Sequence, residues 1–93
     1  MIKLDNNTRN KLNLSLNDRA RLIELEQLNG KEFKVQQMYK FLGISKNTYY
    51  NQLRRLILRG YVNKGRMFYK GEKRVAQYQI NDKLYNDLNN KNK

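Results

Sequence analysis

Cysteine and histidine are both missing from this 93-residue sequence, and their absence excludes several classes of function. Without cysteine there is no disulfide and no thiolate nucleophile, and without either residue the usual zinc ligands are missing. Histidine is also the commonest general base in enzymes. No glycine-rich phosphate loop accompanies the acids of the N-terminal third, which we interpret as solvated helix positions: Asp5, Glu24, Glu26 and Glu32. We therefore expect no enzymatic activity, no cofactor and no bound metal.

Long apolar runs and proline are absent as well. No stretch approaches the roughly 20 apolar residues of a membrane-spanning helix, and the polar N-terminus lacks the apolar core of a signal peptide. We therefore expect a cytoplasmic protein with no membrane partner, and no small-molecule ligand is evident. Hydrophobic residues make up 39% of the chain, which indicates one folded domain rather than disorder. Abundant Asn and Lys are typical of AT-rich genomes, including those of plasmids and phages.

Acidic residues are absent from the whole middle of the chain. Between Phe33 and Gly71 there are 39 residues with no Asp or Glu, and these residues carry +9 of the formal net charge of +12. The cations are Lys34, Lys40, Lys46, Arg54, Arg55, Arg59, Lys64, Arg66 and Lys70. Charges that only support helices or solubility usually occur with both signs, so the missing acids indicate a polyanionic partner.

Three helices are predicted in the first two thirds of the chain. Ser15 and Asp18 have the spacing of a capping box, which predicts a helix over residues 16–28 that ends at Asn29-Gly30. Its inward positions are Leu16, Ala20, Leu22, Ile23, Leu25 and Leu28, and its solvated face holds Arg19, Arg21, Glu24 and Glu26. A brief strand is predicted over residues 32–35, followed by a helix over residues 35–42. The inward face of this helix consists of its apolar residues Val35, Met38, Tyr39 and Leu42.

Gly43 follows that second helix, and Ser45 is placed to cap a third helix over residues 46–59, which ends at Gly60. Its buried stripe is Tyr49, Leu53, Leu56 and Ile57, at i, i+4, i+7 and i+8. The remaining positions give an exposed polar face: Lys46, Asn47, Tyr50, Asn51 and Arg54. A glycine-containing turn between two helices predicts a helix-turn-helix, which delivers its second helix into the major groove of DNA.

After Gly60 the apolar period changes from 3.6 to 2. Strands are predicted over 61–69 and 74–80, joined by a turn over 70–73, with Ala76, Tyr78 and Ile80 on the inward face. Asn81 then caps a short helix over 82–88. Residues 1–14 are expected to form a polar arm that orders on contact with a partner, and residues 89–93 a disordered tail, which leaves the domain at 15–88.

The candidate DNA-binding residues lie on the third helix and the hairpin: Lys46, Asn47, Thr48, Tyr50, Asn51, Arg54, Arg55, Lys64, Arg66, Lys70, Lys73 and Arg74. Asn and Arg suit bidentate contacts with base edges, and Lys and Arg suit phosphates. Several alternatives stay open. The polar stripe of the third helix either contacts DNA or is only a solvated face, as such stripes often are. Thr48 bonds either a phosphate or the backbone of its own helix. The charges of the hairpin either contact DNA or protect an exposed sheet edge, and Arg55 and Arg59 either bind phosphate or point to the flank of the helix.

Aromatic residues are interleaved with these cations: Tyr49, Tyr50, Tyr61, Phe68 and Tyr69. Such rings stack on single-stranded bases in some RNA-binding sheets. We favour the alternative that Tyr49 and Tyr61 are core residues and that Tyr50 is the exposed one. Leucines and a tyrosine at both ends complete either the monomer core or a dimer seam: Leu22, Leu25, Leu28, Leu84, Tyr85 and Leu88.

The stretch from Lys31 to Asn81 resembles the winged helix-turn-helix signature of many bacterial and archaeal transcription regulators. The resemblance rests on the run Leu42-Gly43-Ile44-Ser45, on a strand end at Tyr78-Gln79-Ile80, and on Thr48, Leu53, Leu56, Gly60 and Val62. It implies that the helix from Lys46 recognises DNA and that the hairpin, as a wing, grips the backbone or minor groove. Tyr39 and Tyr49 depart from the smaller core residues usual there, and no effector domain is matched.

The expected fold is α+β, mainly α: a winged helix-turn-helix with a three-helix core, a β-hairpin wing and a short C-terminal helix. The expected function is sequence-specific binding of double-stranded DNA by a small regulator, most simply a repressor, acting as a homodimer. Alternatives are a plasmid or phage replication or partition protein, a nucleoid-type binder, and an RNA- or ribosome-binding winged-helix protein.

Overall fold

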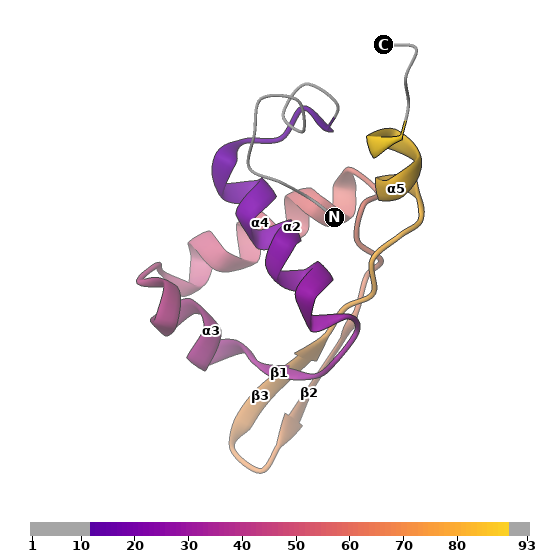
Figure 1. Ribbon diagram of the computed structural model, residues 1–93. Helices are drawn as coiled ribbons and strands as arrows, with labels where there is room; N and C mark the ends of the chain where they lie inside the picture. The colour runs from indigo at the N-terminus through magenta and orange to yellow at the C-terminus, as the bar shows by residue number, and fades with distance from the viewer. Residues whose placement is uncertain (1–11, 90–93) are drawn as a thin grey trace.

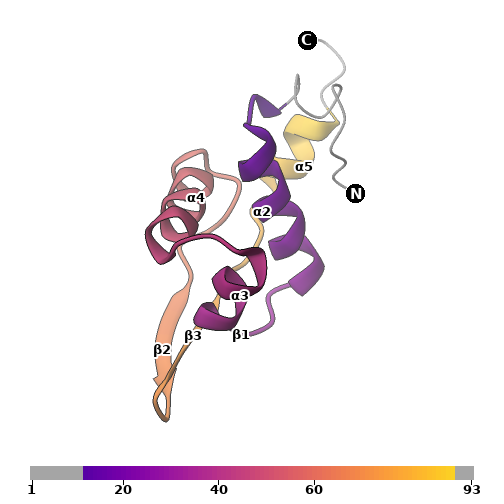
Figure 2. The same cartoon turned by 90° about the vertical axis from the view of Figure 1, so that its left-hand side faces the viewer.

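The computed structural model describes residues 12–89, which form an α+β domain of helices and one small antiparallel sheet (Figure 1). The helices are α2 (Leu16–Leu28), α3 (Val35–Leu42), α4 (Lys46–Leu58) and α5 (Lys83–Leu88), and the strands are β1 (Phe33–Lys34), β2 (Arg66–Lys70) and β3 (Lys73–Gln77). Strand β3 lies in the middle, paired with β1 and β2. Figures 1 and 2 show the β2–β3 hairpin projecting away from the helices, with α5 at the opposite end.

Helix α2 has the predicted bounds, because both ends are encoded locally. The Ser15 hydroxyl accepts a hydrogen bond from the backbone N–H of Asp18 at 3.2 Å, and Asn29 takes the left-handed conformation that stops the helix. The predicted faces are partly wrong. Leu16 is exposed, whereas Asp18 and Arg19 are buried and Arg21 is mostly covered. The inner face of α2 packs against α4, where Asp18 pairs with Arg55, and the mostly covered Arg21 pairs with Glu24 along the same helix.

The core includes residues that the sequence assigned to the arm. Leu12 and Leu14 are buried together with Leu22, Leu25 and Leu84. Residues 12–14 therefore belong to the folded unit, and the domain begins earlier than the predicted residue 15. The rest of the predicted arm, 1–11, and residues 90–93 of the predicted tail lie outside the described residues. The proposed dimer-seam leucines are used inside the monomer: three are fully buried, and Leu28 and Leu88 pack partly against them.

The pair α3 and α4 follows the prediction closely. Gly43, at φ +70°, ends α3, and the Ser45 side chain caps α4 by accepting from the N–H of Thr48. The buried positions of α4 are Tyr49, Gln52, Leu53 and Leu56. Three of the four predicted stripe residues are therefore confirmed, Ile57 is only partly buried, and Gln52 is a polar addition. The ring of Tyr39 on α3 packs against the ring of Tyr49, with centroids 6.4 Å apart.

The hairpin is shorter than predicted. Its paired strands cover 66–70 and 73–77 rather than 61–69 and 74–80, and Val62 and Ile80 meet only in an isolated bridge. The regular pairing ends at Arg66 and Gln77. Next to it, Gly65 lies so close to the opposite segment that a side chain there would overlap the carbonyl oxygen of Gln77 and the ring of Tyr78. The predicted brief strand at residues 32–35 is present as β1, which pairs with β3 through Phe33 and Ala76.

Helix α5 closes the other end of the domain. It begins at Lys83, one residue later than predicted, with Asp82 rather than Asn81 at the N-cap position. The Asn81 side chain still accepts a hydrogen bond from the N–H of Lys83 at 2.8 Å. The Lys83 ammonium reaches back to the carbonyl oxygen of Arg59 at 3.0 Å, and the Tyr61 hydroxyl donates to Asp87 at 2.7 Å. These contacts fix the end of α4 against the C-terminal helix.

Candidate nucleic-acid interface

One face of α4 is polar and open to solvent. Lys46, Asn47, Asn51 and Arg54 are exposed, while the opposite face of the helix is buried in the core. Asn47, Asn51 and Arg54 follow i, i+4, i+7 spacing, so they form a single stripe about 10 Å long. Within the described residues, this stripe carries no acid. Such a stripe has the length and donor groups to meet about three successive base pairs in a major groove.

The start of α4 also settles one alternative for Thr48. Its hydroxyl oxygen accepts from the Ser45 hydroxyl at 2.9 Å, while its backbone N–H donates to the same Ser45 oxygen at 3.1 Å. Thr48 therefore bonds the capping residue and not a carbonyl of its own helix. Its own O–H proton stays free to donate outward, to a phosphate for example, since a hydroxyl is both donor and acceptor.

Tyr50 is not the exposed aromatic that the sequence predicted. It is half-buried, its hydroxyl lies 3.8 Å from the sulfur of Met67, and the Arg74 guanidinium sits 5.4 Å from the centre of its ring. Burial raises the pKa of the Tyr50 hydroxyl, which keeps it neutral. Tyr50 thus joins α4 to both strands of the hairpin and fixes the angle between them.

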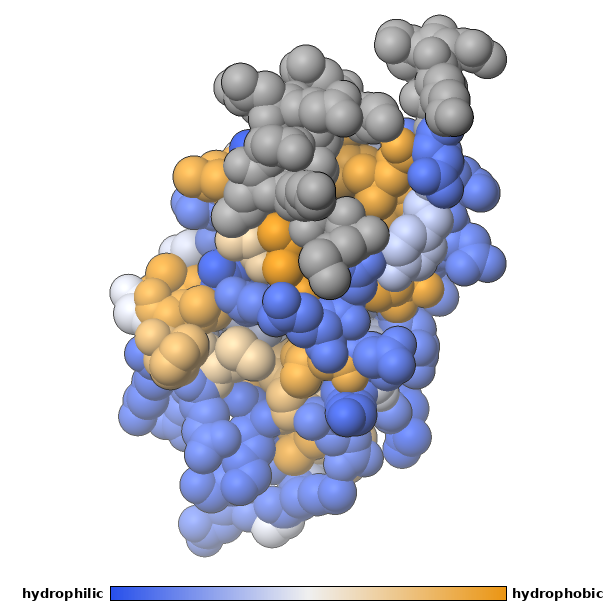
Figure 3. Space-filling model, viewed as in Figure 1, coloured by the Kyte–Doolittle hydropathy of each residue, from blue (hydrophilic) through white to orange (hydrophobic). Residues whose placement is uncertain are grey.

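The hairpin presents the remaining cations of the candidate set. Lys64, Arg66, Lys70, Lys73 and Arg74 are all exposed. In the view of Figure 3, hydrophilic residues dominate the end of the molecule that the hairpin forms. Exposed aromatic surface on the hairpin comes mainly from Tyr69, because Phe68 is half-buried under the Arg66 guanidinium, 5.1 Å from its ring centre. The ladder of rings that single-strand stacking requires is therefore not present on this sheet.

Two of the basic residues in the acid-free stretch have acidic partners after all. Lys70 pairs with Glu32 at 2.6 Å, and Arg55 pairs with Asp18. Both acids come from outside the stretch, so the local sequence does not show these pairs. The expectation that partners are missing is corrected for these two residues.

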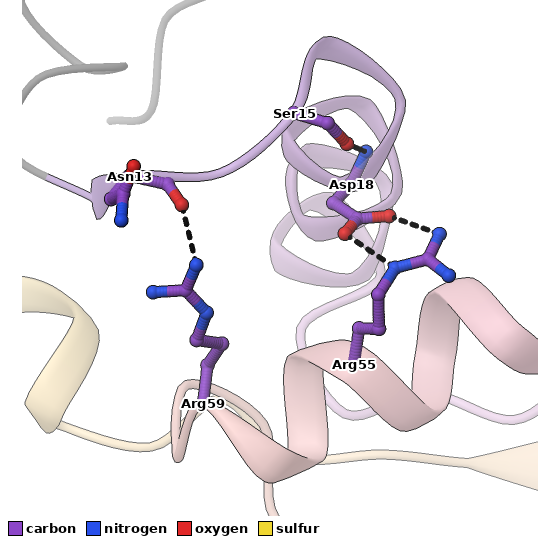
Figure 4. Close-up of polar contacts among 5 residues, drawn as sticks. All are labelled: Asn13, Ser15, Asp18, Arg55 and Arg59. Carbon is purple, nitrogen blue, oxygen red and sulfur yellow. Dashed lines mark hydrogen bonds and ion pairs between the residues drawn. The ribbon is translucent and has the colours of Figure 1, made fainter.

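Arg55 is directed toward Asp18 on α2 (Figure 4). Its Nε and Nη2 donate to the two carboxylate oxygens of Asp18 at 2.8 and 2.9 Å. These hydrogen bonds raise the pKa of the Arg55 guanidinium. Only 6% of the Asp18 side chain is exposed, whereas half of the Arg55 side chain meets solvent, so the pair joins α2 to α4 through a buried carboxylate and a partly exposed guanidinium. Arg55 is a structural link, and no nearby sequence signal pointed to a partner 37 positions away.

Arg59, the other uncertain cation of this helix, is used in a similar way. Its Nη2 donates to the carbonyl oxygen of Asn13 at 2.6 Å. Figure 4 shows it reaching from the end of α4 to the segment that precedes α2. Arg55 and Arg59 therefore lie on the flank of α4, which is the second of the two alternatives left open by the sequence.

The structure places two further lysines next to the candidate residues of the hairpin. Lys34 and Lys40 line a cleft beside α3 together with Lys73 and Arg74. Both belong to the acid-free stretch, which was the available signal, but nothing in the sequence placed them next to the hairpin. Across residues 12–89 there is no cluster of three or more potential metal ligands of the His, Cys, Asp or Glu type. None of the helices in that range is long and apolar enough to cross a bilayer.

Comparisons with known proteins inform the fold only. No protein-family model matches the chain, and no curated protein matches it. A similar solved structure is the crystal structure of the ST1889 protein from the thermoacidophilic archaeon Sulfolobus tokodaii. The TM-score is 0.66, the match covers 88% of this chain and 80% of that chain, and the sequences are 24% identical. The likeness supports the α+β arrangement of the helices and the small antiparallel sheet.

Proposed function

We propose that this protein is a winged helix-turn-helix regulator that binds double-stranded DNA in a sequence-specific manner and has no catalytic role. The observation that carries the proposal is the polar stripe of α4, defined by Asn47, Asn51 and Arg54, which is exposed and free of acids beside a basic hairpin. A helix fits the width of the major groove, and these side chains have the donors and acceptors that base edges require.

In this proposal each element has a separate task. Asn51 and Arg54 contact base edges, because Asn suits adenine and Arg suits guanine. Lys46 and Thr48, at the first turn of α4, contact the backbone. The hairpin is the wing, and Arg66 and Lys73 lie along a phosphate strand or the minor groove. Tyr50, held under Arg74, keeps helix and wing at the angle that one duplex needs.

Repression is the simplest regulatory outcome, since a protein of this size acts by occupying a promoter or operator. A homodimer would place two α4 helices about 34 Å apart on a palindromic site. Exposed apolar side chains near the start of α2 and the end of α4 offer a seam: Leu16 is 58% exposed and Leu58 is 75% exposed. Sedimentation of the wild type and of Leu58→Ser tests the proposed homodimer. A wild-type protein that is monomeric at DNA-binding concentrations would contradict it.

The test of the proposal measures discrimination. A preferred duplex is selected from a random library, and binding to it is compared with binding to a scrambled duplex by fluorescence anisotropy at one salt concentration. Asn51→Ala and Arg54→Ala are each expected to reduce the preference by about 1–3 kcal/mol. Asn17→Ala, at an exposed position of α2, is the matched control and should bind as wild type does.

Three results would count against the proposal. If Asn51→Ala and Arg54→Ala both discriminate as well as wild type, α4 is not the reading helix. If wild type shows no preference among duplexes and its affinity falls steeply with salt, the protein is a nucleoid-type binder instead. Stronger binding to structured RNA than to any duplex would assign it to RNA.

A further inference from the structure

A narrow cleft separates α3 from β3, next to the proposed reading face. It has a volume of about 170 Å³ and is lined by Lys34, Gln36, Gln37, Lys40, Lys73 and Arg74. Four of these six side chains are cations and none is an acid. Two come from the hairpin and four from α3 or the residue before it, so the cleft exists only because the fold brings these elements together.

The lysines that line this cleft have no acidic partner among residues 12–89. Within residues 12–89, Lys34, Lys40 and Lys73 form no ion pair, in contrast to Lys70 on the same hairpin, which is paired with Glu32. Like charges that converge without an acid repel one another, so an anion in the cleft would be stabilised by all of them at once.

The cleft is physically connected to α4 through one side chain. Arg74 lines the cleft and also covers the ring of Tyr50, which lies on α4 between Asn47 and Arg54. An anion in the cleft and a duplex on α4 would therefore both contact the surface around Arg74. The two amides, Gln36 and Gln37, add neutral hydrogen-bond donors between the cations, as an oxygen-rich anion requires.

We propose that this cleft is a phosphate-binding site that takes one backbone phosphate of the duplex bound by α4, outside the base pairs that α4 reads. Lys34 and Lys40 are the residues that define it, Arg74 is shared with the reading face, and the site rests on the proposed function. A phosphate held beside α3 fixes the register of the helix in the groove, since backbone contacts position a protein while base contacts select the sequence.

The test uses the salt dependence of binding to one fixed duplex. Removing one lysine–phosphate interaction lowers the slope of log K against log salt by about 1. Lys34→Gln and Lys40→Gln are each expected to lower the slope by that amount and to weaken all sequences alike. The matched control is Lys31→Gln, which removes the same charge at an exposed position that lies outside the cleft lining.

A second measurement locates the phosphate. Single neutral methylphosphonates are placed along the backbone of the preferred duplex, and each is tested with wild type and with Lys34→Gln. One position flanking the selected base pairs should weaken wild type clearly but leave the variant unchanged, because the variant no longer has the lysine that binds this phosphate. The proposal would be overturned if the effects of the methylphosphonates and of Lys34→Gln on binding were additive at every position. It would also be overturned if the salt slopes of Lys34→Gln and Lys40→Gln were equal to that of Lys31→Gln.

These outcomes separate failure of the cleft from failure of the function. If wild type binds a preferred duplex and the cleft variants bind it as wild type does, the cleft proposal is wrong and the proposed function stands. If wild type binds no duplex, both are wrong. Saturable shifts of the Lys34 and Lys40 amides with inorganic phosphate, in a protein that ignores duplex DNA, would assign the cleft to a free phosphate and overturn the duplex assignment.

Discussion

Replacing Arg55 with alanine is expected to destabilise the fold without removing a DNA contact, although Arg55 neighbours the proposed reading residue Arg54. The change removes two charge-assisted hydrogen bonds, of 2.8 and 2.9 Å, from a carboxylate whose side chain is only 6% exposed. Breaking a fully buried pair in this way costs about 3–5 kcal/mol. Half of the Arg55 side chain, 52%, is exposed, so water replaces part of the missing interaction. We expect a decrease of about 2–3 kcal/mol in the free energy of unfolding.

Urea denaturation followed by circular dichroism measures this decrease, and the melting temperature should fall by about 10–20 °C for a chain of this size. Arg54→Ala is the matched control. Arg54 makes no hydrogen bond or ion pair with another residue in the range 12–89, so its removal should change stability by less than about 0.5 kcal/mol. Introducing Asp18→Asn into the wild type and into Arg55→Ala completes a double-mutant cycle. A coupling energy of at least about 1 kcal/mol is expected between positions 18 and 55.

The structural role of Arg55 would be refuted if Arg55→Ala were no less stable than Arg54→Ala, or if the cycle showed no coupling. The same conclusion would follow if the two variants exchanged their expected behaviour in the DNA-binding assay. Below the melting temperature of the variant, Arg55→Ala should keep the wild-type preference between duplexes, whereas Arg54→Ala should lose it.

Three further predictions concern the hairpin and the C-terminal closure. Arg66→Gln should weaken binding to every duplex alike and lower the salt slope by about 1, as measured by anisotropy titrations at several salt concentrations. Gly65→Ala should destabilise the fold by about 1–3 kcal/mol in urea denaturation, because the new methyl group overlaps the Gln77 carbonyl. Burial, with the hydrogen bond to Asp87, raises the pKa of Tyr61 from 10.0 to about 12. The folded state therefore holds this proton more tightly than the unfolded state, and the stability it confers below pH 10 is lost as the pH rises to about 12. Unfolding of Tyr61→Phe should depend less on pH in that window, and identical profiles would show that the Tyr61 hydroxyl does not contribute.

The features that the sequence predicted well are those encoded within a few residues. The caps at Ser15 and Ser45 and the stops at Asn29 and Gly43 are all present, because each depends on a hydrogen bond or a backbone conformation inside one turn. Three of the four predicted stripe residues of α4, namely Tyr49, Leu53 and Leu56, are buried for the same reason, since their spacing follows the helix period.

The features that the sequence did not predict depend on contacts between distant segments. Arg55 looked like a phosphate contact until Asp18, 37 positions away, was found against it. Tyr50 looked exposed because its neighbours in sequence do not cover it, whereas Met67 and Arg74 of the hairpin do. The net charge likewise does not tell which lysines and arginines lie close together, because the fold determines this.

The measurement that most directly tests the central claim is a titration of the isotope-labelled protein with its selected duplex, followed through the backbone amide shifts at physiological ionic strength. We expect saturable shifts concentrated in residues 46–54 of α4 and in residues 64–74 of the hairpin region, with smaller changes in α2 and α5. Shifts confined to α2 and α5, or no saturable shift with any duplex, would contradict DNA binding through α4.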